Sequence, residues 1–186
     1  NNVGAISLSS GSSLSSSGGN ITLGGGNSGA GYAVGSTDSS IGILRGIYLS
    51  SSTVNAGAGD IILRGKGSQT GATGEYAIGI DIVGSTQIYT SGSGTIDLYG
   101  VGGINSDSST HSVGINFFQN PSIYSVDGDI TLTGTGGTGS ARNNAGILKD
   151  GGSSDTKIYS STGNITLIGI DSGSGNTEDI ELSGDD

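Results

Sequence analysis

The sequence predicts an all-β protein that folds as a parallel β-helix (β-solenoid) of about five rungs, each of about 35 residues with three short strands. Two observations support this fold class. Aliphatic residues recur two positions apart in short units rather than at helical spacing, and the same units return at a nearly constant interval along the 186 residues. Both ends of the sequence fall within a repeat, so we expect residues 1–186 to form a single solenoid segment taken from a longer repeat array.

Composition excludes several other classes of protein. The chain holds 39 glycines and one proline, which is too little glycine for collagen, where it makes up about a third of the residues. The regular spacing of the aliphatic residues argues against disorder, and the absence of cysteine excludes disulfides. A net charge of −10 disfavours binding to nucleic acid or to anionic lipid surfaces. No apolar run approaches the roughly 20 residues of a membrane helix, so we expect no membrane insertion.

The clearest repeated unit is a strand of the form Asn/Asp-Ile-Thr-Leu. Its isoleucine and leucine are two positions apart and therefore point to the same face of the strand, which we expect to be the inner face. The first isoleucines of successive copies are 40, 35, 34 and 35 residues apart. The five copies are Asn20–Leu23, Asp60–Leu63, Thr95–Leu98, Asp129–Leu132 and Asn164–Leu167.

Two further strand units complete each repeat. The Gly-Ile-x-Ile unit occurs at Gly46–Leu49, Gly79–Ile82 and Gly114–Phe117, with a shorter version at Gly146–Leu148. The Ile-Tyr unit occurs at Ile88–Tyr89, Ile123–Tyr124 and Ile158–Tyr159, and Val54–Asn55 holds its place in the earlier copy. At the two ends of the chain, Ile6–Leu8, Leu14 and Ile180–Leu182 follow the same order.

One repeat cannot bury its own aliphatic face, so we expect equivalent strands to stack into continuous inner columns. One such column is Ile61, Ile96, Ile130 and Ile165. A single rung with three faces is preferred over two rungs of about 17 residues, because three distinct strand signatures recur once per period; both arrangements remain open. The glycines that follow the Ile-x-Leu strands are expected at corners that need positive φ or tight turning, and they are Gly65, Gly100, Gly134 and Gly169.

The repeated units resemble those of a known protein family. The run Gly-Asp/Asn-Ile-Thr-Leu, then a loop of Gly, Thr and Ser, then Gly-Ile and Ile-Tyr, resembles the repeats of large bacterial surface proteins of the filamentous-haemagglutinin-like and adhesin-like β-helix type. The resemblance covers nearly the whole chain. It implies a right-handed coil, secretion to the cell surface, and a role in adhesion, matrix or filament formation.

A column of tyrosines is the first candidate interaction site. Tyr89, Tyr124 and Tyr159 follow inward isoleucines at the repeat spacing, so we expect them to form an outward stripe along the stacked rungs. Such a stripe could stack on sugars or pack against a neighbouring filament. The alternative is that stacked tyrosines only stabilise successive rungs.

No metal, cofactor or catalytic site is predicted. Asp127 and Asp129 are weak candidates for Ca²⁺ ligands, with Asp60 and Asn164 at equivalent positions, but turn residues of this kind usually bind the backbone. His111 is the single histidine, and with only Asp107 near it in sequence we expect an ordinary loop histidine rather than part of a triad.

We therefore expect an extracellular structural or adhesive repeat protein, a filament, sheath or matrix component, and not an enzyme. Its expected partner is itself, through stacked rungs, with glycans or a host or cell surface as further candidates. The alternative is a β-helix polysaccharide lyase or hydrolase, or a glycan-binding module. The charged residues considered for such an enzyme, which are too scattered in the sequence to define a site, are Asp81, Asp97, Lys149 and Arg142.

Overall fold

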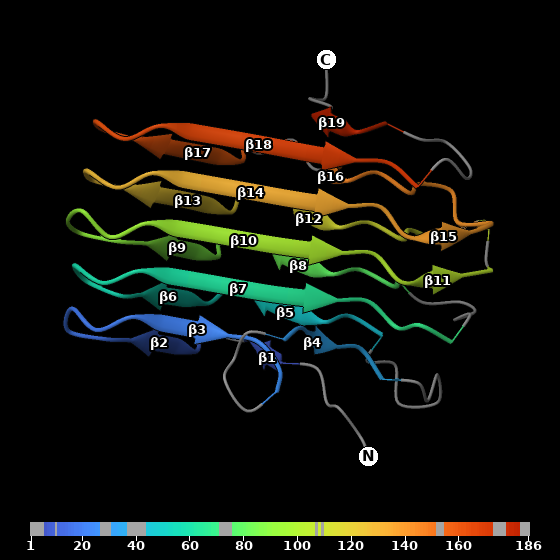
Figure 1. The fold of residues 1–186 in the computed structure, drawn as a ribbon, viewed down its shortest axis with the longest axis horizontal. Helices are drawn as coiled ribbons and strands as arrows, with labels where there is room; N and C mark the ends of the chain where they lie inside the picture. Colours follow the sequence, from blue (N-terminus) through green and yellow to red (C-terminus); the bar gives the residue numbers. More distant parts are fainter. Residues whose placement is uncertain are drawn as a thin grey trace.

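The protein is a right-handed β-solenoid. A computed structural model describes residues 6–9, 11–26, 31–36, 44–70, 76–106, 108, 110–151, 155–172 and 178–182. Within these residues the chain forms only strands, turns and bends, and none of them belongs to a helix long and apolar enough to cross a membrane. In Figure 1 the front strands run left to right, the others return behind them, and the chain climbs from the N-terminus to the C-terminus, which makes the coil right-handed.

Three parallel sheets form the faces of the coil, and each turn contributes one strand to each. Sheet A contains β1 (Ile6–Leu8), β5 (Ile47–Ser50), β8 (Ile80–Val83), β12 (Ile115–Phe118), β16 (Ile147–Asp150) and β19 (Ile180–Leu182). Sheet B contains β2 (Ser13–Ser15), β6 (Thr53–Asn55), β9 (Gln87–Tyr89), β13 (Ser122–Ser125) and β17 (Lys157–Ser160). Sheet C contains β3 (Ile21–Leu23), β7 (Ile61–Lys66), β10 (Ile96–Val101), β14 (Ile130–Thr135) and β18 (Ile165–Ile170).

The register confirms the predicted period. Ile96 of β10 is paired with Ile61 on one side and with Ile130 on the other. Equivalent residues of neighbouring turns are therefore nearest neighbours along the axis, and one period forms one rung with three faces rather than two rungs. From β2 to β17 the chain makes four full turns, with a part-turn at either end.

The first turn is longer than the others because it contains an extra loop. Residues Ile21–Leu23 pair with the first half of β7, and β4 (Ala33–Val34) pairs with the second half. The chain between these two strands leaves the sheet and returns, with an antiparallel bridge between Gly25 and Gly31 at its base. This excursion accounts for the interval of 40 residues that precedes the regular spacing.

The core is a set of aliphatic columns on the inner side of the three sheets. Ile61, Ile96 and Ile130 are fully buried, and so are the inward residues Ile80 and Ile115 of sheet A. The corner between sheets B and C holds a polar ladder that the aliphatic pattern does not reveal. There the hydroxyl of Thr90 donates to Ser125 Oγ at 2.9 Å, and the backbone N–H of Gly128 donates to the same atom. The core is therefore mostly apolar, and the polar residues of this ladder are hydrogen-bonded.

The glycines after the Ile-x-Leu strands have a different role from the one expected. Gly65, Gly100, Gly134 and Gly169 lie inside six-residue strands, and none has a positive φ. A Cβ at Gly100 would overlap the backbone oxygen of Gly114, and the other three meet a backbone oxygen in the same way. The glycines are needed because the end of sheet C crosses the start of sheet A with no room for a side chain. The expectation of positive-φ corners was wrong at these positions.

Left-handed backbone occurs instead where sheet A ends. The residue directly after each of the four strands β5, β8, β12 and β16 has a positive φ. These residues are Ser51 (46°), Gly84 (68°), Gln119 (71°) and Gly151 (44°). The corner from sheet A to sheet B thus requires this conformation in every one of these turns, including the two where the residue is not glycine.

Beyond the glycine crossing, each turn extends into an arm. The arm comprises residues 67–78, 102–113 and 136–145, except for residues 71–75, 107 and 109, which lie outside the described residues. It includes the short pair β11 (Ile104–Asn105) and β15 (Thr138–Gly139), at the right of Figure 1. Ile78, Val113 and Ala145 of its returning limbs form a second apolar cluster with Leu148, which lies on the outer side of sheet A. The arm therefore packs against the outer face of sheet A.

The glycine crossing gives a direct test of the fold. We predict that Gly100→Ala lowers the free energy of unfolding by about 3 kcal/mol, because the new methyl group overlaps fixed backbone. Gly92→Ala is the matched control, since its Cβ would lie 3.4 Å from Ala58 Cβ, an ordinary contact. Thermal unfolding followed by circular dichroism measures both. Equal midpoints of thermal unfolding for the two variants would contradict the close approach of backbone at Gly100.

Candidate functional site

The outer face of sheet A carries a column of side chains that changes from turn to turn. Neighbouring strands place residues of different chemistry in register there, whereas the inner positions of β5, β8 and β12 remain apolar and buried. In order along the axis the outer column is Tyr48, Asp81, Asn116, Leu148 and Glu181. A break in the repeat at an outer position, with the inner positions retained, is not required for packing and indicates a site.

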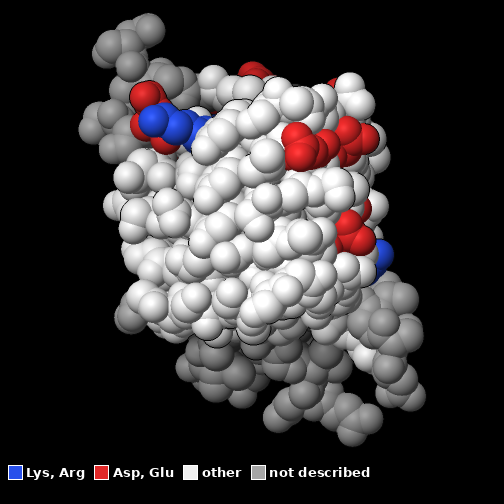
Figure 2. All heavy atoms as spheres, turned by 90° about the vertical axis from the view of Figure 1, so that its left-hand side faces the viewer, with Lys and Arg blue, Asp and Glu red and all other residues white. Residues whose placement is uncertain are grey.

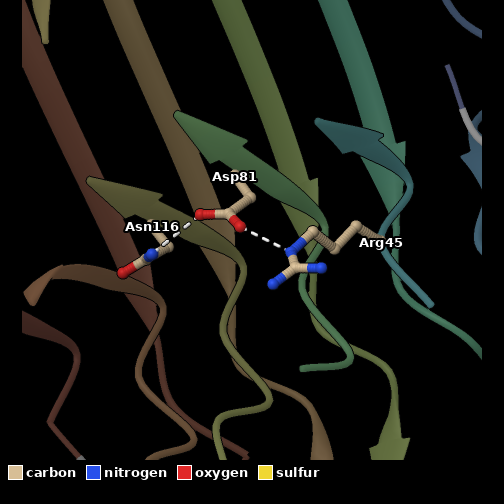
Figure 3. Close-up of polar contacts among 3 residues, drawn as sticks. All are labelled: Arg45, Asp81 and Asn116. Atoms are coloured by element: carbon tan, nitrogen blue, oxygen red, sulfur yellow. Dashed lines mark hydrogen bonds and ion pairs between the residues drawn. The ribbon is translucent and has the colours of Figure 1, made fainter. Parts of the chain in front are cut away.

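Asp81 is the centre of this column. Its side chain is almost fully buried, with 2% exposure. Its Oδ2 atom accepts a hydrogen bond from Arg45 Nε at 2.5 Å, and its Oδ1 atom accepts one from Asn116 Nδ2 at 2.8 Å. Figure 3 shows the three side chains side by side, with Asp81 on β8, Asn116 on β12 and Arg45 just before β5. Three successive turns therefore build one polar cluster.

Burial raises the pKa of Asp81 above the ordinary value for an aspartate, and the nearby Asp150 carboxylate raises it further. The positive charge of Arg45 acts in the opposite direction, together with the hydrogen bonds from Asn116 and Arg45. A charged carboxylate in this position is costly unless a cation accompanies it. Arg45 is that cation.

Aromatic rings surround the guanidinium of Arg45. Its Cζ atom lies 5.1 Å from the ring centroid of Tyr48 and 5.3 Å from that of Tyr76, both within the range of cation–π attraction. The ring of Tyr76 in turn contacts the imidazole of His111, with 5.2 Å between the centroids. Tyr76 and His111 belong to the arm, and Tyr48 belongs to sheet A, so the rings line both sides of the junction.

His111 is buried in this junction, with 7% exposure. Its Nε2 atom lies 3.7 Å from Asp150 Oδ2. Burial lowers the pKa of His111 below its ordinary value, while the Asp150 carboxylate raises it and the charge of Arg142 lowers it. The imidazole is therefore neutral at neutral pH. His111 lies in the loop between β11 and β12, as expected, but the arm carries it onto sheet A, where it is buried. Asp107 lies outside the described residues.

Between the arm and sheet A there is an open cleft of about 230 Å³. Aromatic and aliphatic side chains form its walls, and the Asp81 cluster, His111 and Asp150 provide its polar groups. Its lining residues are Arg45, Tyr48, Tyr76, Ile78, Asp81, Val83, His111, Asn116, Phe118 and Asp150. Because both Asp81 oxygens already accept hydrogen bonds, the arrangement is suited to holding a ligand more than to activating a nucleophile.

Sequence reasoning did not predict this cleft, because the charged residues considered for an enzyme site are too scattered in the sequence and His111 was expected to be an ordinary loop histidine. Asp81 and His111 line it, and Arg142 acts on His111 through its charge. Asp97 instead lies on sheet C, where it accepts from Thr95, and Lys149 occupies an inner position of sheet A at 8% exposure. Three of the residues that were missed lie in the arm or at the ends of strands of sheet A. They are Tyr76 in the arm, Arg45 just before β5 and Asp150 at the end of β16. The changing outer residue of the Gly-Ile-x-Ile units was the available signal.

The predicted tyrosine stripe exists as a stacked ladder on sheet B. The rings of Tyr89 and Tyr124 are 4.7 Å apart at an angle of 4°, and those of Tyr124 and Tyr159 are 5.3 Å apart at 7°. Asn55, the equivalent residue one turn earlier, donates to the hydroxyl of Tyr89 at 3.0 Å. Partial burial raises the pKa of Tyr124, and its two tyrosine neighbours raise it further. These contacts run along the axis, as the stabilising alternative requires.

The candidate calcium ligands accept hydrogen bonds from backbone and side-chain groups of the next turn. Asp129 Oδ1 accepts from the backbone N–H of Asn164 at 2.7 Å, and Asp127 Oδ1 accepts from the Thr162 hydroxyl at 3.1 Å. Asp60 binds the backbone N–H of Thr95 in the same manner. Among the described residues no group of three potential ligands is close enough to hold a metal. Figure 2 views the side of these turns and shows a mostly uncharged surface, with acidic groups along the right-hand edge and a further acidic group beside a basic one at the upper left.

Comparisons with protein-family models, with curated proteins and with solved structures gave no match. The fold assignment therefore rests on the strand register and the coil described above.

The Arg45–Asp81 pair gives a pH-dependent prediction. Because the folded protein holds the Asp81 proton more tightly than the unfolded chain, the charged carboxylate opposes folding, and its cost appears as pH rises through the raised pKa. We predict that Arg45→Ala lowers the free energy of unfolding by about 2–4 kcal/mol at neutral pH. The loss should become smaller as the pH is lowered, because the buried carboxyl becomes protonated and then needs no cation.

Arg64→Ala is the matched control for this experiment. Arg64 also lies over a tyrosine, 5.2 Å from the Tyr99 ring centroid, but it contacts no carboxylate in the described part of the chain. Denaturant unfolding at several pH values measures both variants. If the loss of unfolding free energy in Arg45→Ala does not change with pH, the stabilising effect of Arg45 does not depend on the charge of the Asp81 carboxylate.

The ladder predicts unequal effects for its central and outer members. Tyr124 stacks on two rings and Tyr159 on one. We therefore expect Tyr124→Ala to lower the free energy of unfolding by about 2 kcal/mol and Tyr159→Ala by about half of that. Denaturant unfolding of the two variants provides the comparison. Equal losses would argue that ring stacking contributes nothing.

Proposed function

We propose that the chain is an extracellular structural and adhesive element, a length of solenoid rod that assembles end to end through stacked rungs. The observation that carries the proposal is the regular parallel stacking of the turns, in which equivalent isoleucines pair with one another from turn to turn. The last described turn shows what a further rung would cover. Ile165 is 44% exposed, although the equivalent Ile61, Ile96 and Ile130 are fully buried. Leu182, at an inner position of sheet A, is 60% exposed.

The same turn leaves strand edges without partners among the described residues. β17 and β18 are the last strands of sheets B and C, and each pairs with a described strand on one side only. Unpaired backbone groups at a sheet edge form a ready template for another strand. Apolar inner side chains and unpaired strand edges in this turn suit the addition of a further rung, whether it comes from the same polypeptide or from a second copy.

A second copy of the chain offers a matching rung. Ile21-Thr22-Leu23 in β3 has the same sequence as Ile165-Thr166-Leu167 in β18. Pairing of these strands would reproduce the register of β14 on β18, with isoleucine on isoleucine and leucine on leucine. Such a contact joins two different ends, so it does not close and produces a filament.

A non-enzymatic, extracellular role is part of the proposal. Its support is the adhesin-like pattern of the repeats and the net charge of −10, which favours solubility and disfavours nucleic acid as a partner. Both oxygens of the Asp81 carboxylate already accept hydrogen bonds from neighbouring side chains. The regular coil supplies length and surface, which are what a sheath, matrix or adhesive rod requires.

End-to-end assembly is tested by electron microscopy and sedimentation over a range of protein concentrations. We expect rods whose length increases with concentration. Ile165→Lys should abolish them, because it places a charge in the apolar end. Thr166→Lys is the matched control: it adds the same charge one residue later, on an exposed outer position, and should leave assembly intact. Compact dispersed monomers of the unaltered chain at every concentration would overturn the proposal.

A further inference from the structure

We infer that the cleft between the arm and sheet A is a binding site for a neutral sugar ring. This inference goes beyond the rod-forming role and depends on different residues. It rests on the shape of the cleft, on its combination of ring faces with polar groups, and on buried polar atoms that have no partner among the described residues.

The cleft contains polar atoms that an occupant could satisfy. Asn116 Oδ1 and His111 Nδ1 are buried and make no hydrogen bond in the described part of the chain. The two side chains are 6% and 7% exposed, and both line the cleft. Buried polar groups are nearly always paired, so each exception calls for an explanation. Both atoms are closed to solvent in this structure, so the hydroxyl groups of a ligand would reach them once the two side chains move.

Asp81 is held ready for the same purpose. Arg45 and Asn116 fix its carboxylate from two sides, and the outer edge of the cleft holds a second carboxylate, Asp150, at 39% side-chain exposure. Sugar hydroxyls both donate and accept hydrogen bonds, so carboxylate, amide and guanidinium groups close together suit adjacent hydroxyls on one ring. The cluster is therefore a rigid set of donors and acceptors.

The apolar part of the cleft matches the other side of a sugar. Phe118 at the end of β12 is 36% exposed at the cleft, and Val83 and Ile78 line it as well. A pyranose ring presents C–H groups on its faces and hydroxyls on its edge, so it can lie against an aromatic ring while its edge contacts the polar cluster. The cleft separates these two kinds of surface in the same way.

The charge and the volume of the cleft limit the kinds of ligand that it can hold. Arg45 is paired with Asp81, the imidazole of His111 is neutral, and Asp150 leaves a negative charge at the rim. Together with the overall charge of −10, this disfavours uronic or sialic acids. At about 230 Å³ the cleft is smaller than the roughly 300–1,000 Å³ of sites for drug-sized ligands, so it accommodates one ring, either a terminal residue or one unit of a longer glycan.

The experiment uses the whole chain and a panel of methyl glycosides of glucose, galactose, mannose and glucuronic acid. Saturation-transfer NMR identifies binding, and titration of chemical shifts measures Kd. We expect saturable binding of at least one neutral glycoside and weaker binding of the glucuronide. No binding of any neutral glycoside up to the solubility of the panel, or preference for the glucuronide, would overturn the inference.

Variants locate the site. Phe118→Ala and Asp150→Asn alter partly exposed side chains and should each weaken binding by about tenfold, the factor expected for the loss of one good contact. Ile104→Ala is the matched control, because Ile104 is 38% exposed outside the cleft, and it should leave Kd unchanged. Loss of binding in Tyr124→Ala, with Phe118→Ala unaffected, would place the sugar on the tyrosine ladder and overturn the inference.

The test separates this site from end-to-end assembly. Ile165→Lys should remain able to bind the glycoside, since Ile165 lies in sheet C and does not line the cleft. A chain that assembles but does not bind sugar removes only the cleft inference, and a chain that binds sugar but does not assemble removes only the proposed function. Circular dichroism of each variant confirms that it is folded before Kd is compared.

Discussion

Parallel register between turns is the constraint on which the rest of the structure depends. Ile61, Ile96 and Ile130 contact one another although each is separated from the next by a whole turn. A single turn holds too few buried side chains to offset the entropy of ordering its backbone, so each turn needs the hydrogen bonds and apolar contacts of the next. This explains why inner positions keep the same chemistry while the outer ones vary.

Freedom at the outer positions produces two different surfaces. On sheet B the outer residue remains tyrosine through three turns, and the rings stack along the axis, so this column adds to the stability of the coil. On sheet A the outer residue changes from Tyr48 to Asp81 to Asn116, and a carboxylate is buried that the core does not need. Repetition accompanies stability in the first case, and in the second its interruption places a buried polar cluster where we propose a ligand site.

The fold could be predicted from the sequence because the inner columns determine both the pattern and the structure. Alternation within Ile96-Asp97-Leu98 and its return at a fixed interval specify the strands, their faces and their neighbours. The glycine crossing could not be predicted, because Gly100 looks the same in sequence whether it turns the chain or lets two backbones approach. The burial of the Asp81 carboxylate could not be predicted either, because its partner Arg45 lies in another turn and does not recur at the repeat spacing.

The cleft was missed for a further physical reason. It forms where the arm folds back onto sheet A, and that contact depends on how far the chain travels beyond the glycine crossing before it returns. Tyr76 and His111 reach sheet A only because the returning limbs pair with one another, as in the hydrogen bond from Ala77 N–H to the His111 carbonyl. Loop residues of this kind carry no periodic signal, and they acquire a position only when the stacked turns supply a scaffold.

End-to-end assembly and sugar binding, if both occur in the same chain, would reinforce one another. A cleft of this size that holds one sugar ring offers few contacts, so a single copy binds weakly. The cleft lies in the central turns, away from Ile165 and the open end, so stacking copies would leave it accessible. Every copy added to a filament would present one more cleft at a fixed spacing, and simultaneous engagement of several would raise the overall affinity without any new contact. A regular coil with one irregular outer column is therefore a physically sufficient design for an adhesive surface.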